Sequence, residues 1–269
     1  MTDKRSRIRG WRKITSATWG HPNDPQIYGD LEVDAGKLLE FIDEARTSSG
    51  VRLSVTHMVG KSIAYALGEH PDLNVHMHGN YFIHNPTVDI FFIVSTDKGA
   101  ELDGVKVTDA DKKSVVEIAR ELSDRAGRIR AGDDAELGKT KKVIGSTPRR
   151  LLGLSMKTAA WLTTDKGMDL KKYGLPRQPF GSAMVSSVGM FGIQHAYAPL
   201  SPYYRIPFLV LVGEVAEKPA VVDGQIVARP LLTVSATMDH RYVDGFHAAR
   251  LARSTRAYLE DPKSFEPAF

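Results

Sequence analysis

A strand-like segment leads directly into a helical segment near the end of the chain. From Leu232 to Met238 apolar and polar residues alternate, which is the pattern of a strand with one buried face. The residues from Phe246 to Leu259 then predict a helix that ends at Glu260-Asp261-Pro262. Because helical and strand-like patterns are interleaved in this way along the chain, we expect an α/β fold.

Three more helices are predicted by apolar spacing and capping residues. They begin with Asp34 as the N-cap, at about Thr56, and at Ser114, where Ser-Val-Val-Glu forms a capping-box pattern. Strand-like apolar runs occupy four other segments: Asn80–Ile83, Asp89–Thr96, Ala183–Ser186 and Phe208–Val215.

Composition narrows the function classes. The chain has 269 residues, of which 42% are apolar and 25% charged, values typical of globular proteins rather than disordered, collagen-like or coiled-coil chains. It contains no cysteine, which excludes a disulfide scaffold, a thiolate metal site and a cysteine nucleophile. The net charge of +4 suits an anionic small ligand and is too weak to predict nucleic-acid binding.

Residues 139–178 interrupt the alternating pattern. They are rich in Lys, Arg and Gly and contain an apolar patch around Leu151, Leu152, Leu154, Met156, Trp161 and Leu162. We interpret them as an insertion with one short helix, which either packs against its own domain or binds a partner. No linker-like composition divides the chain, so we predict one domain over residues 1–269.

The chain shows no targeting or membrane signal. The first seven residues are charged and no apolar core follows them, and the longest apolar runs fall far short of the roughly 20 residues that span a bilayer. We therefore expect a cytoplasmic location and no membrane partner.

Metal and nucleotide motifs are incomplete. His76-Met77-His78 places two imidazoles on one face of a strand, but no third ligand follows at a suitable spacing, so we expect no metal site. No G-x-G-x-x-G sequence follows a strand, and the glycine that a phosphate-binding loop needs is replaced by Val55.

His240 is the residue best placed for chemistry. The predicted strand ends there, and a short turn through Asp244 and Gly245 leads into the last helix, so the imidazole would lie at the mouth of the sheet. Neutral histidine can accept a proton at cellular pH. Taken singly, each residue also has an ordinary explanation: a buried histidine, an N-cap aspartate and a turn glycine.

Ordered motifs across the chain resemble the acyltransferase component of 2-oxo acid dehydrogenase complexes. The segment Asp239-His240-Arg241…Asp244-Gly245…Ala248-Ala249 looks like the D-H-R-x-x-D-G-x-x-A-A motif of that family, whose H-x-x-x-D-G part chloramphenicol acetyltransferase shares. Four further segments are similar to the family in the same order: Trp11-Arg12-Lys13, Glu69-His70-Pro71-Asp72-Leu73-Asn74, Gly181…Val185-Ser186-Ser187-Val188-Gly189-Met190-Phe191-Gly192 and Leu259-Glu260-Asp261-Pro262.

The resemblance implies a site and a fold. His240 would be the general base, Ser186 would donate to the oxyanion, and Asp244 would form a structural ion pair with Arg12. Ser187 is the competing hydroxyl, and His247 would be structural. No residue is assigned to cofactor binding. The implied fold is a two-layer α/β sandwich like that of chloramphenicol acetyltransferase, with helices beside a large mixed β-sheet.

The implied function is acyl transfer between thioester and thiol carriers, namely coenzyme A and a dihydrolipoamide-type group. The resemblance also implies a homotrimer or a trimer-based cage, with the site between subunits. We expect no lipoyl or subunit-binding domain in this chain, so a lipoyl group would come on a separate carrier, with dehydrogenase subunits as further partners. Two alternatives are a non-catalytic core subunit and a coenzyme A-dependent O- or N-acyltransferase for small molecules.

Two departures from the family pattern bear on the substrate. The segment that reads G-L-x-x-P-V in the family, and helps to line its thiol channel, is Gly99-Ala100-Glu101-Leu102-Asp103-Gly104-Val105 here. The acyl donor or acceptor would therefore differ. The 139–178 insertion lies just before the Ser186 strand, where it would cover a site entrance or alter assembly.

Overall fold

A six-stranded mixed sheet forms the centre of the computed structural model, which describes residues 24–78, 81–96, 101–131, 149–173, 175, 178–200 and 206–267. The strands, in spatial order, are β1 (Gln26–Asp34), β8 (Gln225–Asp239), β7 (Phe208–Val222), β6 (Ala183–Ser187), β4 (Ile90–Thr96) and β5 (Glu101–Val107). Strands β4, β6 and β7 run parallel, and the other pairings are antiparallel.

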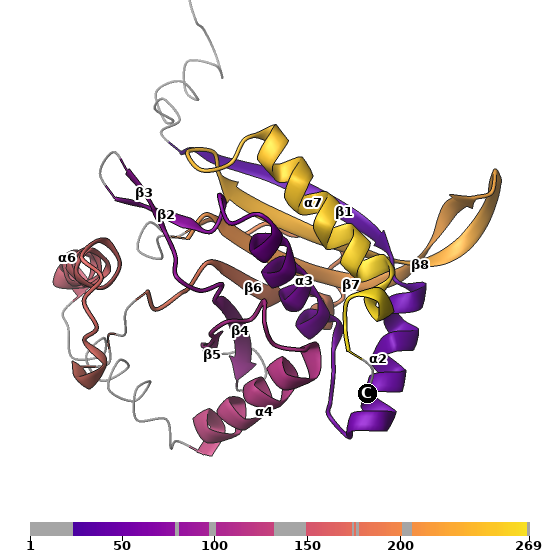
Figure 1. Ribbon diagram of the computed structural model, residues 1–269, viewed down its shortest axis with the longest axis horizontal. Coiled ribbons are helices and arrows are strands. Elements are labelled where there is room, and N and C mark those ends of the chain that lie inside the picture. The colour runs from indigo at the N-terminus through magenta and orange to yellow at the C-terminus, as the bar shows by residue number, and fades with distance from the viewer. Residues whose placement is uncertain are drawn as a thin grey trace, which may run out of the picture.

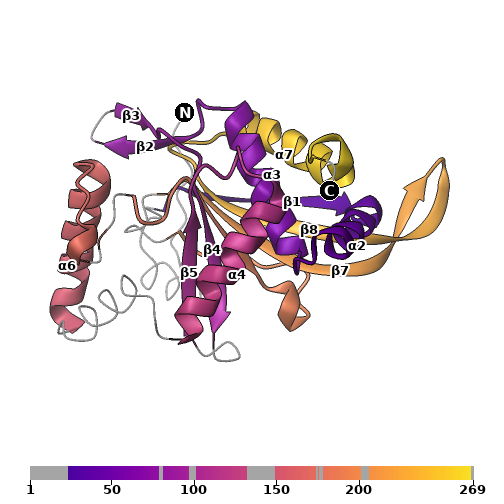
Figure 2. The same cartoon turned by 60° about the horizontal axis from the view of Figure 1, so that its bottom comes forward.

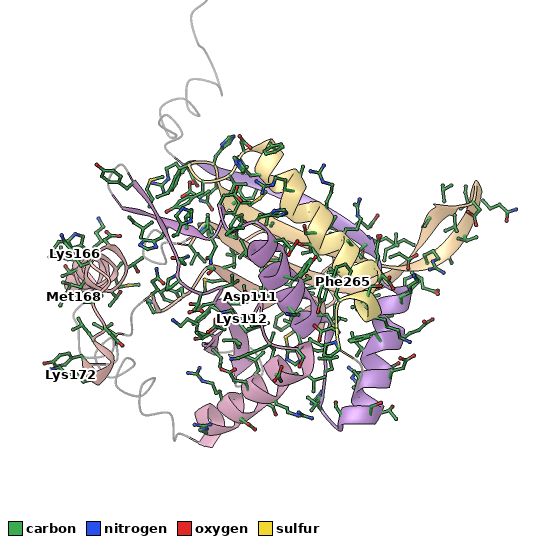
Figure 3. All side chains as sticks on the ribbon, viewed as in Figure 1. Asp111, Lys112, Lys166, Met168, Lys172 and Phe265 are labelled. Carbon is green, nitrogen blue, oxygen red and sulfur yellow. The ribbon has the colours of Figure 1, made fainter. Side chains whose placement is uncertain are left out.

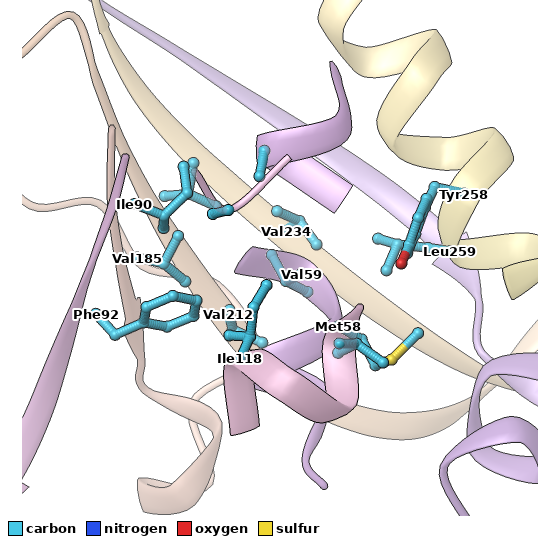
Figure 4. Packing of buried hydrophobic residues seen from close by; sticks show 14 of the residues in the cluster. Met58, Val59, Ile90, Phe92, Ile118, Val185, Val212, Val234, Tyr258 and Leu259 are labelled. Carbon is cyan, nitrogen blue, oxygen red and sulfur yellow. The ribbon is translucent and has the colours of Figure 1, made fainter. Parts of the chain in front are cut away.

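Four helices cover one face of this sheet (Figures 1 and 2). They are α2 (Gly36–Ser49), α3 (Val55–Glu69), α4 (Val115–Ala131) and α7 (Gly245–Glu260). Apolar helix side chains such as Val59 of α3 and Ile118 of α4 pack on the strand side chains that face them. The strand side of this core includes Phe92, Val185 and Val234 (Figure 4). Burying each such side chain contributes about 1.5–3 kcal/mol. This arrangement confirms the predicted α/β sandwich with a large mixed sheet.

In the described part of the chain, residues 188–200 cover the other face of the sheet, beginning with the short helix Gly189–Phe191. The backbone of this segment joins β7 through two 2.9 Å hydrogen bonds, from Val188 N–H to the Val212 carbonyl and from Glu214 N–H to the Ile193 carbonyl. A smaller apolar cluster forms on this face around Met184. The polar members of the alternating β8 pattern, Thr233, Ser235 and Thr237, are buried here.

Shorter elements lie outside the sandwich. A two-stranded hairpin is formed by β2 (Val75–His78) and β3 (Tyr81–His84). The insertion holds α6 (Arg149–Ala160), and the remaining short helices are Trp161–Asp165, Lys171–Tyr173, Gly189–Phe191 and Pro262–Ser264. No helix in the described part of the chain is long and apolar enough to cross a membrane.

Strands β7 and β8 continue past the sheet as a two-stranded arm, which projects from the body in Figures 1 and 2. A two-residue turn closes its tip, where Asp223 and Gly224 adopt φ values of 51° and 79°. Two positive φ angles match the right-handed twist of a hairpin. Val221 and Ile226 beside this turn are 74% and 79% exposed.

Several predicted boundaries need correction. Asp34 is the last residue of β1 and not the N-cap of α2; the cap position is Ala35, although the Asp34 carboxylate accepts a 2.9 Å hydrogen bond from Gly36 N–H. Strands β7 and β8 extend well beyond the predicted Phe208–Val215 and Leu232–Met238, because pairing within the arm replaces burial there. Strand β1 was not predicted, apolar patterning did not identify β5, and β2 begins one residue before the strand expected at His76–His78.

Candidate active site

His240 lies immediately beyond the last residue of β8, at the open end of the sheet. Asp239 still pairs with Gln26 of β1, and the His240 N–H donates a 2.7 Å hydrogen bond to the Pro25 carbonyl. The backbone is thus held by the sheet as far as the His240 N–H, while His240 itself is exposed. His240 therefore follows the end of its strand, as expected from the sequence, and its role as a base stays a prediction.

An ion pair fixes the residues that flank His240. Asp239 is 5% exposed, and its carboxylate accepts hydrogen bonds from the backbone and the guanidinium of Arg241, the shortest being 2.5 Å from Nη2 to Oδ2. The hydrogen bond to Asp239 raises the pKa of Arg241. The ion pair between Asp239 and Arg241 thus spans the residue that lies between them, His240.

Tyr242 joins the same turn to the β2–β3 hairpin. The backbone N–H of Met77 donates a 2.8 Å hydrogen bond to the Tyr242 hydroxyl, and the Tyr242 ring lies 5.6 Å from the ring of Phe82. This hairpin therefore lies against the segment that carries His240.

Asp244 caps helix α7. Its carboxylate accepts a 3.1 Å hydrogen bond from His247 N–H and lies 2.7 Å from Nδ1 of the same residue. The backbone hydrogen bond from His247 is the main cause that lowers the pKa of Asp244. Arg12, its predicted ion-pair partner, lies outside the described residues, so that pair stays a prediction.

Ser186 lies in β6, on the face of the sheet opposite the helices. Val185 belongs to the helix-side core and Met184 to the cluster on the other face, so alternation turns the Ser186 hydroxyl away from the helices and the Ser187 hydroxyl toward them. The two candidate hydroxyls thus belong to different faces.

The structure does not bring Ser186 and His240 of one chain together. Ser186 is in register with Leu211 of β7, and Leu211 with Ser235 of β8. Asp239 thus lies two strands away from Ser186 across the sheet and four residues farther along β8. From the spacing of strands and the rise per residue, the Cα atoms of Ser186 and Asp239 are about 16 Å apart. A base and an oxyanion donor must each lie about 3 Å from the reacting atoms.

A polar cluster that was not predicted from the sequence lies around Asp30, which is in register with Ser186 across β7 and β8. Asp30 pairs with Ser235, accepts a 2.6 Å hydrogen bond from Tyr197, and lies 3.8 Å from Nδ1 of His195. Burial raises the pKa of Asp30, but the hydrogen bonds from Tyr197 and Ser235 outweigh it and leave a lowered pKa. The bond to Asp30 raises the pKa of Tyr197 to about 12.

His76, part of the weak metal pattern, is buried in a polar network. Its Nδ1 lies 2.8 Å from Oδ1 of Asn85 and 3.0 Å from Nε2 of Gln178. Among the residues that the structure describes, no group of three or more His, Asp or Glu side chains is arranged to hold a metal ion.

A comparison of the sequence with models of protein families establishes the family of this chain. Residues 2–137 and 178–266 match the family described as 2-oxoacid dehydrogenases acyltransferase (catalytic domain). This chain belongs to that family. The predicted membership is confirmed, and the acyltransferase match leaves out residues 138–177, close to the predicted insertion at 139–178.

Individual relatives agree with the acyltransferase family. The chain is 24% identical, over 95% of its own length and 55% of the relative, to the dihydrolipoyllysine-residue acetyltransferase component of the acetoin cleaving system from Bacillus subtilis. It therefore spans about half the length of that curated relative.

Solved acyltransferase structures share the fold. A probable dihydrolipoamide acetyltransferase from Listeria monocytogenes aligns with a TM-score of 0.68 and 22% identity, over 99% of this chain and 98% of that one. The cubic core of the pyruvate dehydrogenase multienzyme complex and Azotobacter vinelandii dihydrolipoamide acetyltransferase, studied for a serine, a histidine and an asparagine in its mechanism, both align with a TM-score of 0.65 and 22% identity, over 90% of this chain and 84% of theirs.

Proposed function

We propose that this chain catalyses acyl transfer between the thioester of an acyl-coenzyme A and the thiol of a dihydrolipoyl group. The observation that carries the proposal is the position of His240. It is an exposed imidazole on a turn at the end of β8, inside the family's D-H-R…D-G motif. Both thiols belong to the substrates, which agrees with a chain that contains no cysteine.

The reaction needs a base and an anion-stabilising donor. Neutral His240 removes the proton from the attacking thiol, and the resulting sulfur adds to the carbonyl carbon of the thioester. The hydroxyl of Ser186 donates a hydrogen bond to the oxygen that becomes negative. When the intermediate collapses, the original carbon–sulfur bond breaks and the leaving sulfur takes the proton from His240. No acyl-enzyme forms.

In this proposal His240 of one copy works with Ser186 of a neighbouring copy. The separation of about 16 Å across β7, which follows from strand spacing and rise, supports this arrangement. The fold shared with a cubic multienzyme core supports assembly into a trimer or a trimer-based cage. Arg12 and Asp244 form the structural pair that shapes the site.

We further propose a single catalytic domain over residues 1–269 with the 139–178 region inserted. Coenzyme A acts as a substrate, and a lipoyl group arrives on a separate carrier. Dehydrogenase subunits are the proposed partners and the cytoplasm the proposed location. The match on both sides of the insertion, and the name of the Bacillus relative, support this assignment.

Acyl transfer from acetyl-coenzyme A and longer acyl-coenzyme A compounds to free dihydrolipoamide tests the proposal. The wild-type chain should transfer, His240→Ala should lose activity, and Ser186→Ala should lower kcat roughly a hundredfold or more. Ser187→Ala and His84→Ala are matched controls, since Ser187 faces the helices and His84 lies exposed in β3.

Full activity in His240→Ala would overturn the assignment. A stable assembly with no transfer from any acyl-coenzyme A would indicate a core subunit without catalysis. Transfer to small alcohols or amines but not to dihydrolipoamide would indicate a small-molecule acyltransferase.

A further inference from the structure

The segment that the family match omits carries an unusual share of the charge. Residues 138–177 contain ten Lys and Arg residues and two Asp residues, a net charge of +8. The whole chain has a net charge of +4, so the remainder carries −4. A basic element has therefore been added to an otherwise acidic domain.

The described part of this segment exposes apolar and basic side chains together. Trp161 and Tyr173 are 46% and 58% exposed, and each has an exposed lysine over its ring, Lys166 at 5.2 Å and Lys172 at 4.9 Å from the ring centres. Leu154 and Met168 are also exposed, at 65% and 43%. We call these six residues the lysine–aromatic face.

This combination is typical of a contact surface. Large aromatic side chains, methionine and paired cations are enriched where proteins bind partners, and isolated domains seldom expose several of them together. Figure 3 shows Lys166, Met168 and Lys172 on the outer side of the molecule, far from Phe265 in the sandwich. The six residues come from α6 and from the segment that follows it as far as Tyr173.

The end of the insertion contacts the β2–β3 hairpin beside the His240 segment and continues into the strand that carries Ser186. Nε2 of Gln178 donates a 2.8 Å hydrogen bond to Oδ1 of Asn85 and lies 3.0 Å from Nδ1 of His76 in β2. The next residue of β2, Met77, is the one that donates to Tyr242. Beyond Gln178 the chain leads into β6 and Ser186. In Figures 1 and 2, α6 lies on the same side of the molecule as β2 and β3.

We propose that the lysine–aromatic face docks an acidic carrier protein that presents the dihydrolipoyl thiol to the site. This inference rests on the proposed function, in which a dihydrolipoyl group is the thiol substrate. Cations on the chain select a negatively charged partner and speed its encounter, while the exposed rings and Leu154 supply apolar contact area. The carrier then binds on the side of the molecule where the β2–β3 hairpin lies next to the His240 segment.

Two synthetic peptides of equal length test the surface. Each holds one central dihydrolipoyl-lysine, flanked by glutamates in the first and by lysines in the second, and acetyl transfer from acetyl-coenzyme A is followed with both and with free dihydrolipoamide. Wild-type chain should show a KM about tenfold lower for the glutamate peptide at low salt. Raised salt should remove the difference.

The variant Lys166→Glu with Lys172→Glu should raise the KM for the glutamate peptide about tenfold and leave kcat and the KM for free dihydrolipoamide unchanged. The control Arg52→Glu with Arg253→Glu makes the same charge change at two exposed residues outside the insertion and should change none of these values. Thermal unfolding confirms that both variants are folded.

Equal KM values for the two peptides, or an equal effect of both variants, would overturn the inference. Loss of assembly in the Lys166/Lys172 variant, measured by mass photometry, would also overturn it. The face would then contact a second copy of the chain. If no transfer occurs even to free dihydrolipoamide, the proposed function fails, and anisotropy titration of the labelled peptides still tests docking.

Discussion

The backbone N–H of Met77 donates a 2.8 Å hydrogen bond to the hydroxyl of Tyr242, and so links the β2–β3 hairpin to the turn that carries His240. Two segments separated by 165 positions in the sequence are joined at this point. The first prediction concerns this bond.

Tyr242→Phe removes the acceptor and leaves the Met77 N–H without its partner. We expect a loss of about 1–2 kcal/mol in the free energy of unfolding, with roughly tenfold faster hydrogen exchange at the Met77 amide. Hydrogen exchange monitored by NMR measures both the site and the size of the effect. Tyr81→Phe, at a residue that is 74% exposed, should change neither quantity. Unchanged exchange at Met77 would show that the bond contributes nothing to holding the hairpin.

The second prediction uses mixed assemblies. If each site takes His240 from one copy and Ser186 from the next, His240→Ala and Ser186→Ala homo-oligomers are both impaired. In a ring assembled from an equal mixture, about one quarter of the sites then regain both groups. We expect transfer activity to rise to about that fraction of wild type after joint refolding. Activity that stays at the level of the separate variants would place both groups in one chain.

The third prediction concerns the pH dependence of stability. Burial is the main cause that lowers the pKa of His57 from 6.5 to about 4, and its Nδ1 accepts a hydrogen bond from Ser54 N–H at the start of α3. Between pH 6.5 and 4 the unfolded chain binds a proton at His57 that the folded chain does not bind. Stability should therefore fall as the pH falls through this range, by up to about 3 kcal/mol from this residue.

His57→Gln keeps an acceptor at the same capping position and removes the titration. Urea denaturation at pH 7.5, 5.5 and 4.5 should show a flatter decline for this variant than for wild type. An equal slope in the two proteins would assign the acid sensitivity to other groups.

The fourth prediction tests the segment that covers the Ser186 face. A Cβ atom at Gly213 would overlap the carbonyl oxygen of Gln194, so Gly213→Ala must displace this segment from β7. We expect a loss of about 3 kcal/mol in chemical denaturation, as for other overpacked positions. In Gly127→Ala the new methyl group meets no neighbour within 4 Å in helix α4, so this variant should gain about 0.5–1 kcal/mol. A neutral Gly213→Ala would show that the covering segment shifts freely.

Local sequence patterns predicted the strands and helices that bury one face and expose the other. The alternation in Leu232–Met238 identified the face that packs on the helices, and the Ser114–Glu117 capping box marked the start of α4, where Glu117 accepts a 2.7 Å hydrogen bond from Ser114 N–H. Strand β5 lacked such a signal, because Glu101 and Asp103 give it little apolar character. The arm of β7 and β8 is stabilised by pairing rather than by burial, so hydropathy could not show its length.

The candidate site was predictable only in part. The motif around His240 identified the turn, and the structure shows that the sheet holds the backbone as far as the His240 N–H. The distance between Ser186 and His240 depends on strand order, which no local pattern contains. Asp30, His195 and Tyr197 come together because β1 pairs with β8 and because residues 188–200 fold back over the sheet. Such long-range placement follows from topology and not from spacing in the sequence.

Strand β8 runs without interruption from Gln225, at the tip of the projecting arm, to Asp239, next to His240. Its fifteen residues correspond to about 46 Å of extended chain, with His240 beyond one end and the exposed side chain of Ile226 near the other. The register shift in β7 between Val212 and Val215 divides this ladder into a part within the sheet and a part in the arm. A molecule that contacts the arm therefore contacts the same strand whose other end is followed directly by His240.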